Sequence, residues 1–304
     1  MNHSRRSFIQ QSAIVLAGSS IFSNQLFAAS AAKTLTGVQL YSVREDMRKN
    51  PLGTLQALAD MGYKNVEHAN YINRKFYGYA AKDFKKVLAD YGLAMPSGHT
   101  VMGKNHWDAN KKDFTDAWKY TIEDAATVGQ EFVISPWFDE SMRKTYDDMK
   151  GYMDVFNKCG ELCHKSGMRF GYHNHNFEFT ESLNGQKVYD IILDNTDPSL
   201  VTQQLDMGNL IGTGADAYAI VAKHPGRFVS LHVKDEIKVA KGEMGDGYES
   251  TILGTGVANT KAITDLGKKS GGTLHFIIEQ ESYQGKTPLE CVKEDLSVMK
   301  SWGY

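Results

Sequence analysis

The chain has 304 residues, of which 41% are hydrophobic and 23% are charged, as is usual for a globular protein. With 34 basic and 36 acidic residues, its net charge is −2 at pH 7. This balance provides no general attraction to nucleic acid or to an anionic membrane, so a polyanionic partner or substrate is not expected.

The amino terminus has the organisation of an export signal. Arg5 and Arg6 precede a weakly apolar stretch from Ala13 to Phe27, and a small-x-small site follows at Ala29-Ser30-Ala31. These features are typical of a twin-arginine signal peptide, whereas a basic amphipathic helix is the alternative. We expect residues 1–31 to be removed and the mature protein to be periplasmic or otherwise exported. The apolar stretch is short and interrupted by polar residues, so no stable membrane anchor is expected.

The rest of the chain alternates short β-branched or aromatic runs with amphipathic stretches. We expect strands at 35–42, 63–69, 93–99, 132–137, 168–175, 200–206, 228–234 and 273–279. We expect helices at 51–61, 81–91, 112–128, 141–166, 188–194, 216–223, 258–270 and 288–302. Four of the helix candidates end at a glycine, in Met61-Gly62, Tyr91-Gly92, Val128-Gly129 and Ser166-Gly167. Glycine just past a helix readily adopts the left-handed conformation that ends it.

This alternation predicts an α/β fold, a (β/α)8 TIM barrel formed as a single domain by residues 32–304. Such barrels typically take ~250 residues, and apolar strands flanked by helices indicate a parallel sheet covered on its outside. An open doubly wound sheet is the rival, but no Gly-x-Gly-x-x-Gly follows the first strand. The longest segments expected to be irregular, 99–111 and 236–257, follow strands three and seven and could form a rim or lid at one end of the barrel.

The three cysteines indicate a structural role. Cys159 and Cys163 are four residues apart in an expected helix, a geometry that rarely closes a disulfide, and Cys291 stands alone in another helix. We expect all three to be buried as small apolar side chains.

Four consecutive strand candidates end in residues that commonly bind metals, namely His173, Asp206, His232 and Glu279. Functional groups of such a barrel come from the carboxyl ends of different strands, so these side chains are expected to meet there. Mixed imidazole and carboxylate ligation suits Mn²⁺, Zn²⁺, Fe²⁺ or Co²⁺ better than Ca²⁺. The pattern therefore predicts one divalent metal ion, and a structural use of all four groups is the alternative.

Further candidates lie around these four residues. Side chains two apart on a strand share a face, so His175, Lys234 and Glu281 form a second tier that could contact a substrate. The ends of earlier strands add four candidate substrate-binding residues, Tyr41, Glu67, His99 and Trp137. An aromatic ring at a barrel mouth can stack on the apolar face of a sugar, although packing against loops would explain Trp137 equally well.

Six segments carry a resemblance to a known family. They are Gly37-Val-Gln-Leu-Tyr-Ser-Val-Arg44, Gly171-Tyr-His-Asn-His-Asn-Phe-Glu-Phe179, Gln204-Leu-Asp-Met-Gly-Asn209, Leu231-His-Val-Lys-Asp235, Leu253-Gly-Thr-Gly-Val257 and Ile278-Glu-Gln-Glu281. Together they resemble the sugar phosphate isomerase/epimerase family of xylose isomerase-like TIM barrels, in the AP endonuclease family 2 superfamily. The resemblance covers about residues 35 to 300.

The resemblance implies a mononuclear site in which Asp206, His232 and Glu279 match the usual ligands of strands six to eight. Many epimerases of this group have a glutamate at the end of strand five, so that two carboxylates exchange protons on opposite faces of the substrate. Here that position is His173, and the nearest carboxylate is Glu178. Either His173 replaces the glutamate as a ligand, which we prefer, or Glu178 folds back toward the metal.

Related apurinic endonucleases hold three zinc ions with extra histidines. This chain has Asn209 where a second histidine of strand six would be expected, and it has no basic excess. DNA repair is therefore not expected.

The chemistry implied by the resemblance is removal of a proton from a carbon next to a carbonyl, through a metal-stabilised enediolate. His175 is the first candidate base, Glu178 or Glu281 its partner acid, and Lys234 could hold a substrate oxygen. We expect a sugar isomerase or epimerase first, and a lyase or dehydratase acting on keto-sugars such as 3-keto glycosides as the alternative. A non-catalytic carbohydrate-binding barrel is a third possibility. The expected partner is a small sugar or keto-sugar, and the oligomeric state stays open, a homo-oligomer included.

Overall fold

The computed structural model describes residues 34–242, 245, 247–270 and 272–304. The predicted signal peptide, residues 1–31, lies outside the described residues, so export stays a prediction. Among the described residues, no helix has both the length and the apolar character needed to cross a membrane.

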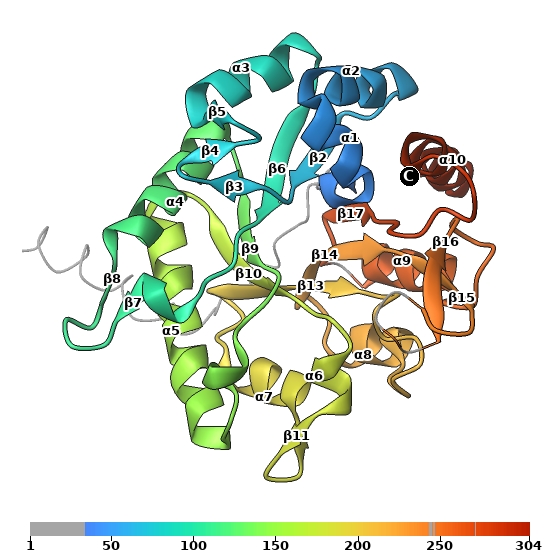
Figure 1. The fold of residues 1–304 in the computed structure, drawn as a ribbon. Coiled ribbons are helices and arrows are strands. Elements are labelled where there is room, and N and C mark those ends of the chain that lie inside the picture. The colour runs from blue at the N-terminus through green and yellow to red at the C-terminus, as the bar shows by residue number, and fades with distance from the viewer. Residues whose placement is uncertain (1–33, 243–244, 246, 271) are drawn as a thin grey trace, which may run out of the picture. The chain divides into compact units, whose positions relative to one another are not determined.

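Eight parallel strands close into a barrel (Figure 1). Its strands in spatial order are β1 (Leu35–Gln39), β17 (His275–Ile278), β14 (Phe228–Val233), β13 (Val201–Asp206), β10 (Arg169–His173), β9 (Phe132–Ser135), β6 (Ala94–His99) and β2 (Asn65–His68). The sheet closes because β1 pairs with β17 on one side and with β2 on the other. Each strand falls within its expected range, which confirms the predicted barrel.

Helices surround the strands, as Figure 1 shows. All the expected ones are present, and they are α2 (Pro51–Met61), α3 (Ala81–Asp90), α4 (Asp116–Val128), α5 (Tyr146–Lys165), α7 (Val188–Asn195), α8 (Ala217–Lys223), α9 (Thr260–Lys269) and α10 (Pro288–Trp302). Helix α5 begins later than predicted because Thr145 caps it, its hydroxyl accepting a hydrogen bond from the Asp148 N–H. Short helices α1 (Arg44–Lys49) and α6 (Phe177–Thr180), with 3-10 turns η1 (Leu40–Val43), η2 (Lys104–His106) and η3 (Glu140–Met142), were not predicted.

Small antiparallel units follow several barrel strands. They are β3 (Tyr71–Ile72), β4 (Lys75–Phe76) and β5 (Tyr79–Ala80) after β2, β7 (Trp107–Asp108) and β8 (Asp113–Phe114) after β6, β11 (Ser182–Leu183) and β12 (Gln186–Lys187) after α6, and β15 (Asp235–Lys238) and β16 (Tyr248–Thr251) after β14. The expectation that 99–111 and 236–257 are irregular was therefore wrong in part. Pairing of β8 with β7 also explains why α4 begins only at Asp116.

The structure contains both the glycines predicted to end helices and the predicted buried cysteines. Gly62 and Gly129 follow α2 and α4 with φ of 104° and 102°, in the left-handed region that favours glycine. Cys159, Cys163 and Cys291 are free and buried. The Trp118 indole N–H donates to the Cys159 Sγ at 3.0 Å, inside the core between barrel and helices.

Two buried aspartates fix the glycine-rich segment that follows β16. The Asp235 carboxylate accepts hydrogen bonds from the backbone N–H groups of Gly254, Gly256 and Ala258, at 2.8 to 3.0 Å. Gly256 has no room for a side chain, because a Cβ atom there would lie 2.3 Å from the Glu236 carbonyl oxygen. From α10, Asp295 accepts the Leu253 N–H at 2.9 Å, and its second oxygen has no partner among the described residues.

Asp295 should make stability depend on pH. Burial raises the pKa of this carboxyl to about 7 from its ordinary value near 3.8. Between these two values the unfolded chain releases the proton while the folded protein keeps it, so the free energy of unfolding falls as pH rises. The fall is about 1.4 kcal/mol per pH unit between pH 5 and 7. Asp295→Asn should lack it, so urea unfolding should favour the variant more at pH 8 than at pH 5. Parallel pH profiles for the two proteins would contradict this account.

Candidate metal centre

Four side chains predicted as ligands converge at the carboxyl end of the barrel. His173 ends β10, Asp206 ends β13, His232 lies on β14 and Glu279 directly follows β17. One potential ligand atom from each lies within 4.8 Å of the other three, and all four residues are buried. Strand register explains part of this meeting, because Asp206 pairs directly with His232. The structure thus brings the four together, as strand-end positions in a barrel require.

Asp206 offers an oxygen that the protein leaves unsatisfied. Its Oδ1 accepts hydrogen bonds from the N–H groups of Gly208 and Asn209 at 2.8 and 3.0 Å. Its Oδ2 is buried without a hydrogen-bond partner among the described residues and lies 3.9 Å from the His232 Nδ1. Burial raises the pKa of Asp206 to about 7. An orphaned buried carboxylate oxygen is costly unless a cation contacts it, so this donor set fits a metal ion.

His232 lies between two carboxylates. Its Nδ1 is 2.9 Å from Glu279 Oε2, and its Nε2 is 2.7 Å from Glu67 Oε1. Burial acts to lower the pKa of His232, but the charges of Glu279 and Glu67 outweigh it and raise the pKa to about 10. The carboxylates therefore demand a positive charge at this point, which a protonated imidazole or a bound cation can supply. With a cation at Nδ1, the Nε2–H would still donate to Glu67, an arrangement common around metal-bound histidines.

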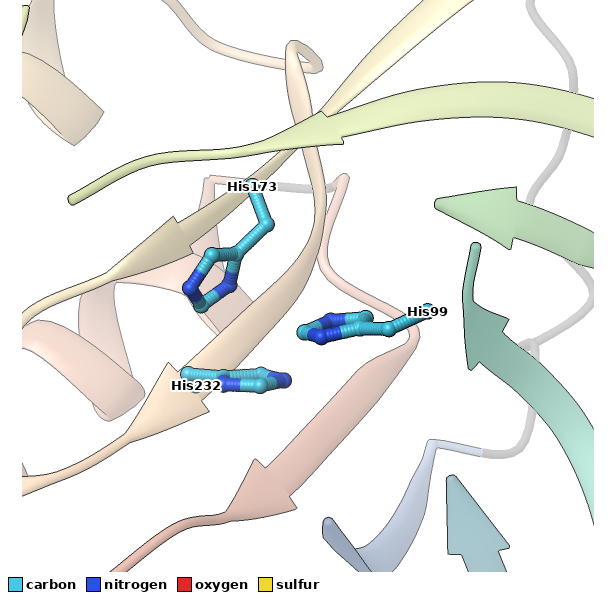
Figure 2. A group of neighbouring side chains, drawn as sticks. All are labelled: His99, His173 and His232. Carbon is cyan, nitrogen blue, oxygen red and sulfur yellow. The ribbon is translucent and has the colours of Figure 1, made fainter. Parts of the chain in front are cut away.

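Gln204 orients two further histidines, which Figure 2 shows beside His232. Its side-chain oxygen lies 2.7 Å from the His99 Nε2 and 3.1 Å from the His173 Nδ1. Because an amide oxygen only accepts, both nitrogens carry hydrogen, and the His173 Nε2 is left with a lone pair for a ligand. His99, His173 and His232 also approach closely enough to form a three-histidine group. The His99 Nε2 is already engaged by Gln204 and Glu67, and the four-residue group adds two carboxylates that would neutralise the charge of a divalent cation.

Glu67 requires a correction. Sequence reasoning placed it against the substrate, but its side chain is fully buried beneath the histidines. It accepts hydrogen bonds from Gln39, Ser97, Gln204 and His232, and its Oε1 lies 3.1 Å from the His99 Nε2. Burial alone would raise the pKa of Glu67, but nearby His99 and His232 hold it well below its ordinary range. Its position is that of a residue that orients the histidines rather than one that contacts a ligand.

A cavity of about 370 Å³, the central cavity, opens at this group, and His173 and Glu279 form part of its wall. Five of the predicted catalytic or substrate-binding residues line it, namely Tyr41, His99, Trp137, His175 and Glu281. The His175 ring lies edge-on to Trp137, with ring centroids 5.4 Å apart, and its Nδ1 has no hydrogen-bond partner among the described residues. Burial and the charge of Lys234 lower the pKa of His175 to about 4, so its imidazole is neutral at pH 7. A neutral imidazole beside the cavity can accept a proton.

Lys234 and Glu178 do not reach this cavity. Lys234 is fully buried, and its ammonium donates to Asn209 Oδ1 at 3.1 Å and to the Glu281 carboxylate. Lys234 therefore positions Glu281. The sequence had predicted a different role, in which Lys234 holds a substrate oxygen. Glu178 accepts hydrogen bonds from the Tyr172 hydroxyl and the His175 N–H, on the side of β10 that faces the surrounding core. Its position supports neither the predicted fold-back toward a metal nor direct proton transfer.

Sequence reasoning gave no role to Gln204 or Asn174. Asn174 exchanges hydrogen bonds with the backbone of Asp206, accepting its N–H at 3.0 Å and donating to its carbonyl at 3.2 Å. Gln204 precedes Asp206 by two residues, so strand alternation alone could have placed it on the same face. No comparable signal existed for Asn174, because its partner lies on a neighbouring strand.

Comparisons with known proteins agree with this architecture. A sequence model of the family described as xylose isomerase-like TIM barrel matches residues 55–302. The inosose dehydratase of Geobacillus thermodenitrificans is 27% identical over 160 residues, which cover 48% of this chain and 52% of that enzyme. The match thus spans only about half the length of this relative.

Two solved structures share the fold. A sugar phosphate isomerase/epimerase from Parabacteroides distasonis superposes with a TM-score of 0.76 at 27% identity, covering 90% of this chain and 96% of that one. The IOLI protein with a bound zinc atom superposes with a TM-score of 0.67 at 12% identity, covering 88% and 98%. The second likeness concerns the fold alone. Because the family match extends over most of its length, the chain belongs to the xylose isomerase-like TIM barrel family.

Proposed function

We propose that this protein is a divalent-metal-dependent enzyme that removes a proton next to the carbonyl group of a keto-sugar and then eliminates a β-substituent. The observation that carries the proposal is the convergence of His173, Asp206, His232 and Glu279 beneath a cavity lined by the neutral His175. The dehydratase and isomerase/epimerase relatives support an enzyme that acts on a small sugar-like molecule.

The metal would be held by the His173 Nε2, the orphaned Asp206 Oδ2, the His232 Nδ1 and the Glu279 carboxylate. Two imidazoles with two carboxylates suit Zn²⁺, Mn²⁺, Fe²⁺ or Co²⁺, and zinc occupies the distant IOLI neighbour. A bound divalent ion would polarise a carbonyl oxygen and stabilise the negative charge that develops on it. Glu67 and Gln204 would keep the imidazoles in the required tautomers and orientations.

His175 is the proposed base. It lies beside the ligand group, with its ring centroid 5.1 Å from that of His173, and it lines the central cavity, where its neutral imidazole can take a proton from a substrate carbon. Glu178 fixes the backbone at this point through the His175 N–H, at 2.9 Å. Glu281, held by Lys234, faces the same cavity and can accept a hydrogen bond from a substrate hydroxyl.

Elimination is favoured over isomerisation by the residues at strand five. A two-carboxylate proton exchange needs a second glutamate across the substrate, but β10 supplies His173, and Glu178 is turned toward Tyr172. Elimination can proceed with a single base, because the protonated His175 can return its proton to the departing oxygen, and the Geobacillus relative is a dehydratase. Isomerisation or epimerisation, the function expected first from sequence, is the second candidate because the Parabacteroides structure matches nearly the whole chain.

Metal binding should depend far more on the proposed ligand Asp206 than on Glu67, which only supports the ligands. Asp206→Asn replaces the orphaned carboxylate oxygen with a neutral amide of similar shape, so the purified variant should contain no stoichiometric metal. Glu67→Gln removes no ligand but weakens the support of His232 and Gln204, so it should lower affinity by about 10- to 100-fold. The exposed Asp154→Asn is the control and should bind metal normally. Mass-spectrometric metal analysis and competition with a chelator measure both effects, and full metal content in Asp206→Asn would refute the ligand assignment.

Removal of His175 should stop proton transfer without removing metal. General bases typically contribute about 10²- to 10⁴-fold, so His175→Ala should lose rate on that order and keep its metal content. The control is His164→Ala, an exposed histidine on α5. NMR in D₂O with keto- and aldo-sugars, 3-keto glycosides included, follows deuterium uptake and shows whether the product has lost its β-substituent. Deuterated product that retains every substituent would favour the isomerase, and neither deuterium uptake nor loss of a substituent with any substrate would argue against both reactions.

A further inference from the structure

The mouth of the barrel continues beyond the central cavity. A second hollow of about 670 Å³, here called the side cavity, is lined by residues of β3, the segment after β6 and α4. The two cavities share Ala69, His99 and Val101. Figure 1 shows β3 and α4 on the same side of the barrel. Because the side cavity is the larger of the two, a ligand confined above the metal-ligand group would leave most of the mouth empty.

Exposed apolar side chains gather at these two cavities. Among the described residues, seven large hydrophobic side chains are exposed, and five of them line one cavity or both. Tyr41 and Trp137 line the central cavity, Ile72 and Tyr120 line the side cavity, and Val101 lies at the junction. Exposed large hydrophobic groups that cluster in one concave region are typical of a binding surface rather than of random exposure.

Tyr120 is held in place as a platform. The Arg74 guanidinium lies over its ring, 4.2 Å from the ring centroid. Arg74 is in turn fixed by Asp124 through two hydrogen bonds of 2.9 and 2.8 Å, and the Tyr71 hydroxyl donates to the same carboxylate at 2.6 Å. Tyr120 nevertheless stays 44% exposed, so a ring entering the side cavity can contact it. This network fixes an aromatic surface before any ligand arrives, which lowers the entropic cost of binding.

The charge of the side cavity argues for an uncharged ligand. Arg74 is its only lysine or arginine among the described lining residues, and both Asp124 and Glu123 form ion pairs with it. A phosphate group would have to compete with these carboxylates. The remaining wall offers an aromatic ring, aliphatic groups and small polar side chains such as Asn70 and Thr100, a combination that suits the apolar face and the hydroxyl groups of a sugar.

We propose that the side cavity binds a second, uncharged sugar ring attached to the ring that reacts in the central cavity. The substrate is then a disaccharide or a longer glycoside rather than a free monosaccharide or a sugar phosphate. This inference rests on the proposed function in taking the central cavity as the place of reaction. Beyond the proposed function, the inference adds the second sugar ring and its contact with Tyr120.

Binding to the metal-loaded mature protein tests the proposal without requiring turnover. Dissociation constants are measured by calorimetry or ligand-observed NMR for glucose, maltose, cellobiose and glucose 6-phosphate. At least one disaccharide should bind more tightly than glucose. Tyr120→Ala should weaken that disaccharide by about three- to tenfold, the range for loss of one aromatic contact, and should leave glucose unchanged. Tyr120→Phe keeps the ring and should bind like the wild type.

Tyr218→Ala is the matched control, because Tyr218 on α8 is 45% exposed and lies outside both cavities. Equal behaviour of Tyr120→Ala and Tyr218→Ala would overturn the proposal. So would a wild-type protein that binds glucose, or glucose 6-phosphate, at least as tightly as both disaccharides. Tyr120-dependent disaccharide binding, with neither deuterium exchange nor loss of a substituent from any keto-sugar tested, would refute the proposed reaction and leave the side cavity assignment standing.

Discussion

Negative charge buried at the end of the barrel is the constraint on which the site depends. Glu67, Asp206 and Glu279 are all buried around His232, and an ionised carboxylate without compensation costs several kcal/mol in such surroundings. The protein compensates them unevenly. Glu67 has hydrogen-bond donors on both oxygens, whereas Asp206 Oδ2 has none among the described residues. A cation between Asp206, His232 and Glu279 resolves this imbalance, and the proposed function follows from that requirement.

The residues around this charge form layers with different tasks. Beneath it, Glu67 and Gln204 fix the imidazoles, and Ser97, Gln39 and Ser230 hold Glu67 and Gln204 in turn. Above it, His175 and Glu281 face the cavity. A hydrogen bond positions each of them, from the His175 N–H to Glu178 and from the Lys234 ammonium to Glu281. Ionisable groups that seemed equivalent in the sequence thus divide into those that can meet a substrate and those that orient them.

Much of the fold could be predicted because its signals are local and repeated. Apolar or β-branched runs marked most of the barrel strands, and glycines such as Gly62 marked the helix ends, so even the strand-end residues His173, Asp206, His232 and Glu279 could be placed together. The hairpins of two-residue strands, such as β7 with β8, escaped prediction because they are too short to show periodicity. The burial of individual side chains at the strand ends could not be predicted either. Glu67 and His99 both lie near the carboxyl ends of strands, but only the packing of neighbouring strands buries the first and exposes an edge of the second.

The direction of a side chain after a strand ends was equally beyond the sequence. Glu178 lies five residues past His173, and the short helix α6 turns it toward Tyr172 and away from the cavity. Lys234 lies one step beyond His232 on the expected face, yet the carboxylate of Glu281 and the amide of Asn209 draw its ammonium group inward. Strand alternation predicted the face correctly for His175 and Glu281, whereas ion pairing decided the outcome for Lys234.

The central claim is a single divalent ion bound by these four residues, and anomalous diffraction from crystals of the mature protein tests it most directly. Data collected on both sides of the zinc or manganese absorption edge, after soaking with that metal, would locate the ion. The account predicts one strong peak per chain at about 2.0–2.2 Å from His173 Nε2, Asp206 Oδ2, His232 Nδ1 and a Glu279 oxygen. A peak bound instead by His99, His173 and His232, or no peak at the end of the barrel, would contradict it.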